Sequence, residues 1–232
     1  MNPNTSLSLS ERLAAVQARI AAAETRFGRT SGSVRLLAVS KTQEAAAIRA
    51  AHGAGQLAFG ENYLQEALAK QAALADLPLE WHFIGQLQTN KTRPIAEHFA
   101  WVHGLTSVHH AERLSRQRPP DLPPLKVCLE INISGEDTKG GVPPDQAAEL
   151  LAACRELPHL ELVGLMCLPA PAAGEAAQRQ PFRALRELRD RLASPDCPLS
   201  VLSMGMSDDL EAAIAEGATL VRVGTAIFGP RH

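Results

Sequence analysis

Residues 34–42 read VRLLAVSKT, an apolar run that passes directly into small and polar residues. A short run of this kind, rich in branched apolar residues, is typical of a strand buried on both faces in a parallel sheet. Seven further runs share the pattern: 56–60 (QLAFG), 81–85 (WHFIG), 101–105 (WVHGL), 125–133 (LKVCLEINI), 160–167 (LELVGLMC), 199–204 (LSVLSM) and 219–224 (TLVRVG). The chain is therefore expected to contain eight strands.

Helical segments separate these runs. Their apolar residues recur at helical spacing and form four faces: Tyr63, Ala67, Leu68 and Leu74; Ala147, Leu150, Leu151, Cys154 and Leu157; Phe182, Leu185, Leu188 and Leu192; and Leu210, Ala213 and Ile214. A further stripe precedes the first strand, at Leu9, Leu13, Val16, Ile20 and Phe27, and Gly28 follows where it can end that helix.

Eight strands that alternate with helices predict an α/β protein, a (β/α)8 TIM barrel with an extra N-terminal helix. The alternative is an open doubly wound sheet, which the count of eight strands disfavours. The 232 residues are expected to form a single domain over 1–232, since barrels reach this length without splitting. Segments 119–124 (PPDLPP) and 169–180 (PAPAAGEAAQRQ) are interpreted as surface loops.

Composition and charge narrow the class of protein. Lys and Arg number 23 against 25 Asp and Glu, so no basic surface for nucleic acid or for a membrane is indicated. The chain has no signal-like apolar block and no stretch of membrane-spanning length, and its four cysteines lack zinc-ligand spacing. We therefore expect a cytoplasmic protein with reduced cysteines. We also expect a monomer, because no exposed apolar helix face stands out.

In a barrel of this kind, functional groups lie at the C-terminal ends of the strands. At the seventh end, Gly205 and Ser207 precede a predicted helix whose first turn holds Asp208 and Asp209, and Ser207 is the expected N-cap. At the eighth end, residues 224–225 add backbone donors and a hydroxyl. Together these ends are suited to bind a phosphate group. The alternative is that the glycines only serve turns and the serine only caps a helix.

Lys41 directly follows the first strand. One interpretation is a Schiff-base amine, which must be neutral, whereas a free lysine titrates near ~10.4. The apolar residues of its strand and a positive charge from Arg222 would both lower the pKa of such an amine. The alternative is an ordinary solvated lysine at a strand end.

Several long motifs in order resemble the pyridoxal phosphate homeostasis protein family, whose barrel is like the N-terminal domain of alanine racemase. They are AVSKT at 38–42, FGENYLQEA at 59–67, WHFIGQLQTNKTR at 81–93, LEINISGEDTKGG at 129–141, GLMCLPA at 164–170, SMGMSDDLEAAIAEGAT at 203–219 and RVGTAIFG at 222–229. The resemblance runs nearly from end to end and implies a fold-type III barrel that binds pyridoxal 5'-phosphate (PLP).

The resemblance also implies roles for seven residues. Lys41 corresponds to the lysine that forms the internal aldimine with PLP, Arg222 faces the pyridine nitrogen, and Asn62 is a polar neighbour of the ring. The phosphate cup corresponds to Met206, Ser207, Gly224 and Thr225. Proteins of this family are regarded as carriers or regulators of vitamin B6 and of amino and keto acid balance, without established enzymatic turnover. PLP-dependent apoenzymes are the possible acceptors of the cofactor.

The chemistry of Arg222 agrees with that role. A guanidinium stays protonated, so it leaves the pyridine nitrogen without a proton, and a neutral ring is a poorer electron sink. Arg222 would then hold the cofactor while restraining its reactivity. The alternative is a salt bridge between layers of the barrel.

The sequence leaves three other functional interpretations open. An amino-acid racemase needs an acid or base on each face of the substrate, and the sole tyrosine, Tyr63, is better explained by packing at a helix start. A metal-dependent hydrolase would need clustered ligands, yet no H-x-H pair occurs among His82, His98, His103, His109 and His110.

Two further lysines, Lys91 and Lys139, lie in loops at strand ends. Each either accepts the aldehyde transiently during release or is simply solvated, and Lys139 is the stronger candidate of the two for the transient role.

Overall fold

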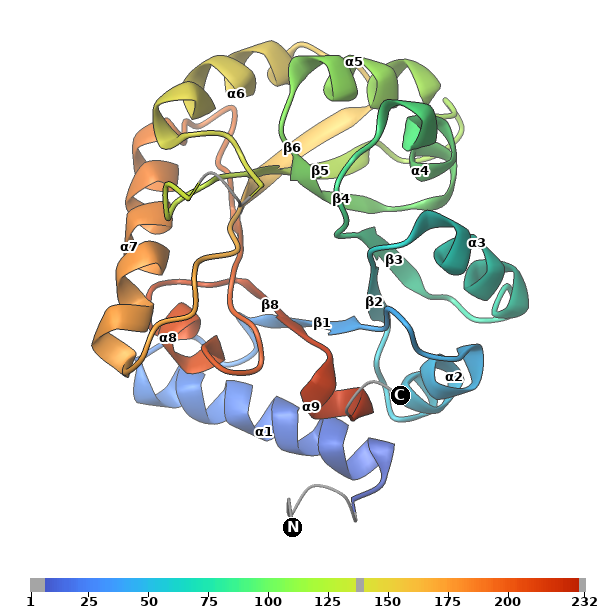
Figure 1. Ribbon diagram of the computed structural model, residues 1–232, viewed down its shortest axis with the longest axis vertical. Helices are drawn as coiled ribbons and strands as arrows, with labels where there is room; N and C mark the ends of the chain where they lie inside the picture. The colour runs from blue at the N-terminus through green and yellow to red at the C-terminus, as the bar shows by residue number, and fades with distance from the viewer. Residues whose placement is uncertain (1–6, 137–139, 230–232) are drawn as a thin grey trace.

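Eight parallel strands close into one barrel, with helices around its outside (Figure 1). The structure is a computed structural model and describes residues 7–136 and 140–229. Each strand pairs with its neighbours in sequence, and β1 pairs with β8. The strands are β1 (Arg35–Val39), β2 (Ala58–Glu61), β3 (Glu80–Phe83), β4 (Trp101–Leu105), β5 (Leu125–Glu130), β6 (Leu160–Met166), β7 (Val201–Ser203) and β8 (Leu220–Val223). Every predicted run overlaps one of them, so the TIM barrel is confirmed and the open sheet is wrong.

The helices follow the strands in alternation. They are α2 (Ala45–Gly53), α3 (Leu64–Ala73), α4 (Thr92–His98), α5 (Val108–Gln117), α6 (Ala147–Arg155), α7 (Glu175–Leu192), α8 (Leu210–Ala215) and α9 (Thr225–Phe228), with short 3-10 turns η2 (Thr89–Lys91) and η3 (Pro144–Gln146). Throughout 7–136 and 140–229, none of these helices combines the length and apolarity that a membrane crossing requires.

The extra N-terminal helix is α1 (Leu9–Arg26), which packs along α8 and α9 (Figure 1). Ser8 and Glu11 form a capping box at its start, where each side chain satisfies a backbone N–H of the other residue. Its buried stripe includes Leu13, Val16 and Ile20, as the helical spacing predicted. Gly28 follows with φ +63°, a conformation that ends the helix and that glycine adopts without strain.

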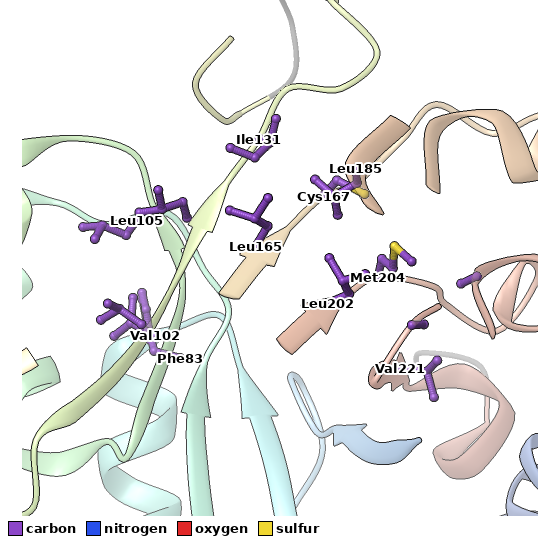
Figure 2. Packing of buried hydrophobic residues seen from close by; sticks show 14 of the residues in the cluster. Phe83, Val102, Leu105, Ile131, Leu165, Cys167, Leu185, Leu202, Met204 and Val221 are labelled. Carbon is purple, nitrogen blue, oxygen red and sulfur yellow. The ribbon is translucent and has the colours of Figure 1, made fainter. Parts of the chain in front are cut away.

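Among the described residues, the apolar core consists of one large cluster and two smaller ones. The large cluster lies between the strands and the helices, and Figure 2 shows part of it, with Val102, Leu165 and Leu202 on strands β4, β6 and β7. Two smaller apolar clusters include Trp101 and Leu37. Since side chains alternate across a strand, Trp101 lies on the opposite face of β4 from Val102. Polar side chains are buried too, among them His82, His103 and Ser203.

Helix α7 begins earlier than the sequence suggested. The segment 169–180 was predicted to be a surface loop, but residues from Glu175 onward are helical. Gly174, with φ +84°, redirects the chain at the helix start. Pro181 lies inside the helix and removes one hydrogen bond. The loss is offset because Phe182 and Leu185 are fully buried against the barrel. The loop prediction is thus wrong for 175–180.

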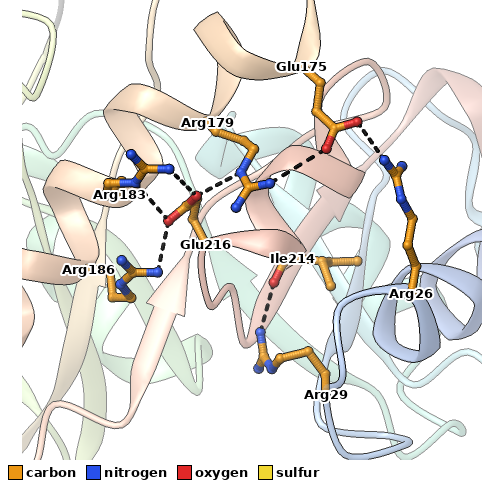
Figure 3. Close-up of polar contacts among 8 residues, drawn as sticks. All are labelled: Arg26, Arg29, Glu175, Arg179, Arg183, Arg186, Ile214 and Glu216. Carbon is orange, nitrogen blue, oxygen red and sulfur yellow. Dashed lines mark hydrogen bonds and ion pairs between the residues drawn. The ribbon is translucent and has the colours of Figure 1, made fainter.

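Helix α7 is also fixed by a buried carboxylate, Glu216, at the end of α8 (Figure 3). Its side chain is 1% exposed and accepts hydrogen bonds from Arg179 at 2.7 Å, Arg183 at 3.1 Å and Arg186 at 2.8 Å. These arginines are spaced so that they share one face of the helix. Burial raises the pKa of Glu216, but the arginine hydrogen bonds and charges outweigh it and leave the pKa below its ordinary value.

Replacing Glu216 with alanine is expected to lower the free energy of unfolding by roughly 1–3 kcal/mol, the usual loss when a charged hydrogen-bond network loses one partner. The loss is not larger because the arginines are partly exposed and can be hydrated. Urea unfolding would measure it at neutral pH. A lowered pKa stabilises the fold above the ordinary carboxyl pKa, so the difference from wild type should shrink as pH falls below about 4. The exposed Glu187→Ala on the same helix is the control, and an equal loss there would contradict this account.

Candidate cofactor-binding site

A pocket of about 570 Å³ lies where β1, β2 and β8 end, within the size range of small-molecule sites. All seven residues that the sequence analysis singled out line it: Lys41, Asn62, Met206, Ser207, Arg222, Gly224 and Thr225. They come from strand ends far apart in the chain, and the closed barrel brings those ends to one mouth.

Lys41 is held in place through its two neighbours. The Ser40 hydroxyl donates to Glu61 at 2.6 Å, and the Ser40 carbonyl accepts from Lys70 at 2.7 Å. The backbone N–H of Thr42 donates to Glu66 at 2.5 Å. These contacts tie the end of β1 to β2 and α3, so the backbone that carries Lys41 is fixed on both sides.

The backbone after Lys41 is also strained. Thr42 has φ +64°, which a β-branched residue rarely adopts. Such strain persists only where surrounding contacts enforce it, and it is concentrated at functional sites. Here the hydrogen bond from the N–H of Thr42 to Glu66, and the one from Ser40 to the buried Glu61, hold the backbone on both sides of Lys41. Burial raises the pKa of Glu61, although hydrogen bonds from Ser40 and Lys70 oppose that shift.

Asn62 offers a polar atom suited to a ligand. Its Oδ1 is buried and has no hydrogen-bond partner among the described residues, although the residue lines the pocket. A buried polar group without a partner is costly unless a ligand or water completes it. The pocket therefore combines an amine, an arginine and an unsatisfied amide oxygen. These polar groups fit a phosphorylated aldehyde with a polar ring.

The end of β7 differs from the prediction. Ser207 was expected to cap a helix that begins at Asp208 and Asp209, but α8 begins at Leu210 and Asp209 occupies the cap position. The backbone N–H of Met206 donates to the carboxylate of Asp209 at 2.6 Å. This contact closes a tight turn before the helix, so the helix starts later. The cap prediction is wrong, and the hydroxyl of Ser207 is not used as a cap.

Helix α1 contributes a residue that the sequence analysis missed. Arg19 lines the pocket and donates to the carbonyl of Ser207 at 3.0 Å and to Glu211 at 2.9 Å. These contacts fix the seventh strand end against α1 and place a positive charge beside it. Arg19 lies on the polar side of an amphipathic helix, where the periodicity alone indicates a solvated side chain, so no sequence signal pointed to it.

Arg222 is buried beneath the pocket on β8. Its Nη1 donates to the carbonyl and to the hydroxyl of Ser203, both at 2.6 Å, and its Nη2 donates to the carbonyl of Cys167 at 2.9 Å. Burial lowers the pKa of Arg222, but a guanidinium starts so high that it stays charged at neutral pH. No carboxylate contacts it within the described residues, so the interpretation as a salt bridge between barrel layers is not supported.

Other predicted residues lie elsewhere. Tyr63 was expected to pack at the start of a helix, but its side chain is 58% exposed, because it occupies the cap position of α3 and points away from the core. Lys91 ends η2 and is not among the described residues that line the pocket. Lys139 lies outside the described residues. Of the five histidines, His82 and His103 are buried within the barrel. No cluster of three potential metal ligands occurs within the described part of the chain.

The fold and the pocket define a class of protein. A family model described as alanine racemase, N-terminal domain, matches residues 12–232, which is nearly the whole chain. The protein is thus a single-domain barrel of the alanine racemase N-terminal class.

More similar relatives define the family within that class. A pyridoxal phosphate homeostasis protein from Pseudomonas aeruginosa is 58% identical over 224 residues, covering 97% of this chain and 96% of that protein. Its counterpart from Escherichia coli K12 is 49% identical over 226 residues, with 96% and 97% covered. The solved structure of PipY from Synechococcus elongatus with PLP bound has a TM-score of 0.82 at 40% identity, covering 96% of this chain and 100% of that one. The chain belongs to the pyridoxal phosphate homeostasis protein family.

Proposed function

We propose that this protein binds pyridoxal 5'-phosphate in the pocket at the barrel mouth and acts in intracellular vitamin B6 homeostasis and in amino and keto acid balance. The observation that supports it most is that the seven predicted residues line a single pocket. PLP is also bound in the PipY structure, which is similar to this chain over almost its whole length. The cofactor supplies an aldehyde and an electron-withdrawing pyridine ring.

In this proposal Lys41 holds the cofactor covalently. The amine of Lys41 would be the group that condenses with the aldehyde of PLP, with loss of one water. The contacts of Ser40 and Thr42 keep the amine at the mouth of the barrel. Asn62 contributes its unpartnered amide oxygen, and Arg222 holds a charged guanidinium toward the ring nitrogen.

Two strand ends hold the phosphate in this proposal. Ser207 and Thr225 offer hydroxyls, and the first N–H groups of α9 have no acceptor within their own helix. Arg19 adds a positive charge on the same side. Because the N–H of Met206 is engaged by Asp209, Met206 contributes through its position on the pocket wall instead.

Replacing Ser207 or Thr225 with alanine is expected to weaken PLP retention by about 1–3 kcal/mol each, the usual cost of losing one hydrogen bond to a charged group. That cost corresponds to a dissociation constant roughly 5–150-fold higher. Equilibrium dialysis with PLP measures it directly. Ser194→Ala, a hydroxyl lost far from the pocket, is the matched control. An unchanged dissociation constant in both pocket variants would remove the phosphate site from the account.

We further propose that the protein is a carrier without catalytic turnover, a monomer that passes PLP to dependent apoenzymes in the cytoplasm. The relatives' name as homeostasis proteins supports the first part. The four cysteines are buried and free, which agrees with a reducing compartment, and burial raises the pKa of Cys128 to about 12, so this thiol is unreactive at neutral pH. A racemase is not favoured, because Tyr63 is not among the described residues that line the pocket.

Incubation of the loaded protein with single L-amino acids in heavy water separates the carrier from the racemase. The carrier should give no steady deuterium incorporation at the α-carbon and no D-amino acid, because a racemase needs an acid or base on each face of the substrate and Tyr63 is not among the described residues that line the pocket. Proton NMR and chiral chromatography provide the two measurements. A bacterial alanine racemase is the positive control, and continuous exchange with accumulation of the D-isomer would refute the carrier.

A further inference from the structure

A line of polar side chains crosses the otherwise apolar interior of the barrel. It starts at the first residue of β3 and reaches the arginine under the pocket. Successive contacts join Glu80 Oε1 to His82 Nε2 at 2.8 Å, His82 Nδ1 to His103 Nε2 at 2.9 Å, and His103 Nδ1 to Ser203 Oγ at 2.8 Å. We call Glu80, His82, His103 and Ser203 the barrel chain. The hydroxyl of Ser203 then accepts from Arg222.

The two ends of the barrel chain are chemically fixed. Arg222 has only donors, and an ionised carboxylate has only acceptors. The hydrogen bond from His82 and the ion pair with Arg35 hold the pKa of Glu80 at about 2, so this carboxylate is ionised at neutral pH. Burial lowers the pKa of both histidines, which are therefore neutral. Each neutral imidazole has one donor nitrogen and one acceptor nitrogen.

Only one assignment of protons satisfies all the contacts. Glu80 must accept, so His82 carries its proton on Nε2 and accepts at Nδ1. His103 then donates from Nε2 and accepts at Nδ1, and Ser203 donates its single proton to that nitrogen. The serine oxygen is left as an acceptor for the guanidinium. The reverse order would require a proton on Glu80 or a charged His82, and the lowered pKa of each group opposes this.

The members of the barrel chain have few other hydrogen-bond partners, because the middle of the chain is enclosed. His82, His103 and Ser203 are fully buried. The indole of Trp101 stacks on His82 with ring centroids 5.0 Å apart. Among the charged groups near this end of the barrel, Arg35 pairs with Glu80 at 2.6 Å and also lies over the ring of Trp101, and Lys126 lies over the same ring. A change at Glu80 therefore has one polar route into the barrel.

We propose that the barrel chain positions Arg222 for the cofactor, with Glu80 setting the tautomers of both histidines from the opposite end of the barrel. The proposal rests on the proposed function, because it assigns the chain a role at the guanidinium that would face the ring. Three of the five N–H groups of Arg222 are used by Ser203 and Cys167. Arg222 also lines the pocket, so its two remaining N–H groups are the ones available to a ligand there.

Long-range proton–nitrogen NMR on the 15N-labelled, cofactor-free protein tests the tautomers first. The proposal expects His82 and His103 to be neutral, with the proton on Nε2 in both. Substituting each histidine in turn assigns the signals. A proton on Nδ1 of either ring, or a charged ring at neutral pH, would overturn the proposal. Because no cofactor is present, this result does not depend on whether the proposed function is correct.

Substitutions at the distant end test the coupling. Glu80→Ala should mix the tautomers of His82, shift the signals of His103, and raise the dissociation constant for PLP roughly two- to thirtyfold, the range typical of coupling through a network. Glu80→Gln keeps a carbonyl acceptor for His82 and should restore both properties. Arg35→Ala is the matched control, because it breaks the same ion pair but leaves the bond from Glu80 to His82 intact.

The outcomes distinguish the positioning role of the barrel chain from the proposed PLP-binding function. Altered tautomers and weaker PLP binding in Glu80→Ala, with both unchanged in Arg35→Ala, support a positioning role. Equal effects in Glu80→Ala and Arg35→Ala would instead assign the effect to the ion pair between the two residues and overturn the positioning role. Unchanged tautomers in Glu80→Ala would overturn it as well. Failure of the wild-type protein to bind PLP, with the expected tautomers present, would refute the proposed function and leave the proton order intact.

Discussion

Replacing Lys41 with alanine is expected to abolish the covalent attachment of PLP, so that protein purified after incubation with the cofactor and desalting is colourless. Lys41 carries the one primary amine among the described residues that line the pocket. Lys70 is nearby, but Glu61 at 2.9 Å and the carbonyl of Ser40 at 2.7 Å already hold its ammonium group. The absorbance spectrum of the desalted protein gives the result. The phosphate contacts remain, so weak and reversible binding persists in dialysis.

The control for this prediction is Lys91→Ala, a lysine on a neighbouring loop that lies outside the pocket. That variant should keep the wild-type spectrum. A coloured Lys41→Ala protein would show that another amine takes the aldehyde, and a colourless Lys91→Ala protein would point to the loop lysine. Circular dichroism should be the same for both variants, because neither side chain belongs to the core.

Replacing Arg222 with methionine is expected to destabilise the fold and to weaken PLP binding together. Methionine fills a similar volume and avoids burying a charge, which by itself would be neutral or favourable. It leaves the carbonyl of Cys167 without its side-chain donor, and a buried unsatisfied acceptor costs about 1–3 kcal/mol, whereas the carbonyl of Ser203 still accepts from the backbone N–H of Cys167 at 3.4 Å. The free energy of unfolding, measured with urea, should therefore fall by about 1–3 kcal/mol, with a measurable loss of cofactor affinity.

Arg93→Met provides the comparison for this second prediction. Arg93 is two-thirds exposed and its ion pair with Glu97 is long, at 3.6 Å, so its loss should change stability by less than about 0.5 kcal/mol. If Arg222→Met unfolds at the same urea concentration as wild type, the three hydrogen bonds of the guanidinium do not stabilise the barrel. The guanidinium would then not be anchored in a fixed orientation by these bonds.

Sequence patterns predicted the strands well, because each strand of a closed barrel is buried on both faces and reads as an apolar run. The run at 125–133 shows the limit of the pattern. Its strand ends at Glu130, although apolar residues continue to 133. Apolar character reports burial, whereas the strand ends where its hydrogen-bond ladder ends. The start of α7 was missed because Pro169, Pro171 and Gly174 indicate a loop, and that signal was extended over residues 175–180, which are good helix formers.

The candidate site was predicted through strand ends and through long motifs, and the structure brings its residues to one pocket. Two kinds of contact lay beyond the sequence. Arg19 reaches the pocket from α1 across nearly the whole chain, to Ser207. His82 and His103 sit on different strands, and only the register of the barrel makes their rings adjacent. Neither spacing nor composition carries information on such register.

Borohydride trapping tests the central claim most directly. The protein is incubated with PLP, reduced, digested and analysed by peptide mass spectrometry. Reduction of the C=N bond should leave a phosphopyridoxyl group on the peptide that contains Lys41, near one group per chain. A label found mainly on Lys91 or Lys139, or no label on any lysine, would contradict the claim that this amine holds the cofactor at the barrel mouth.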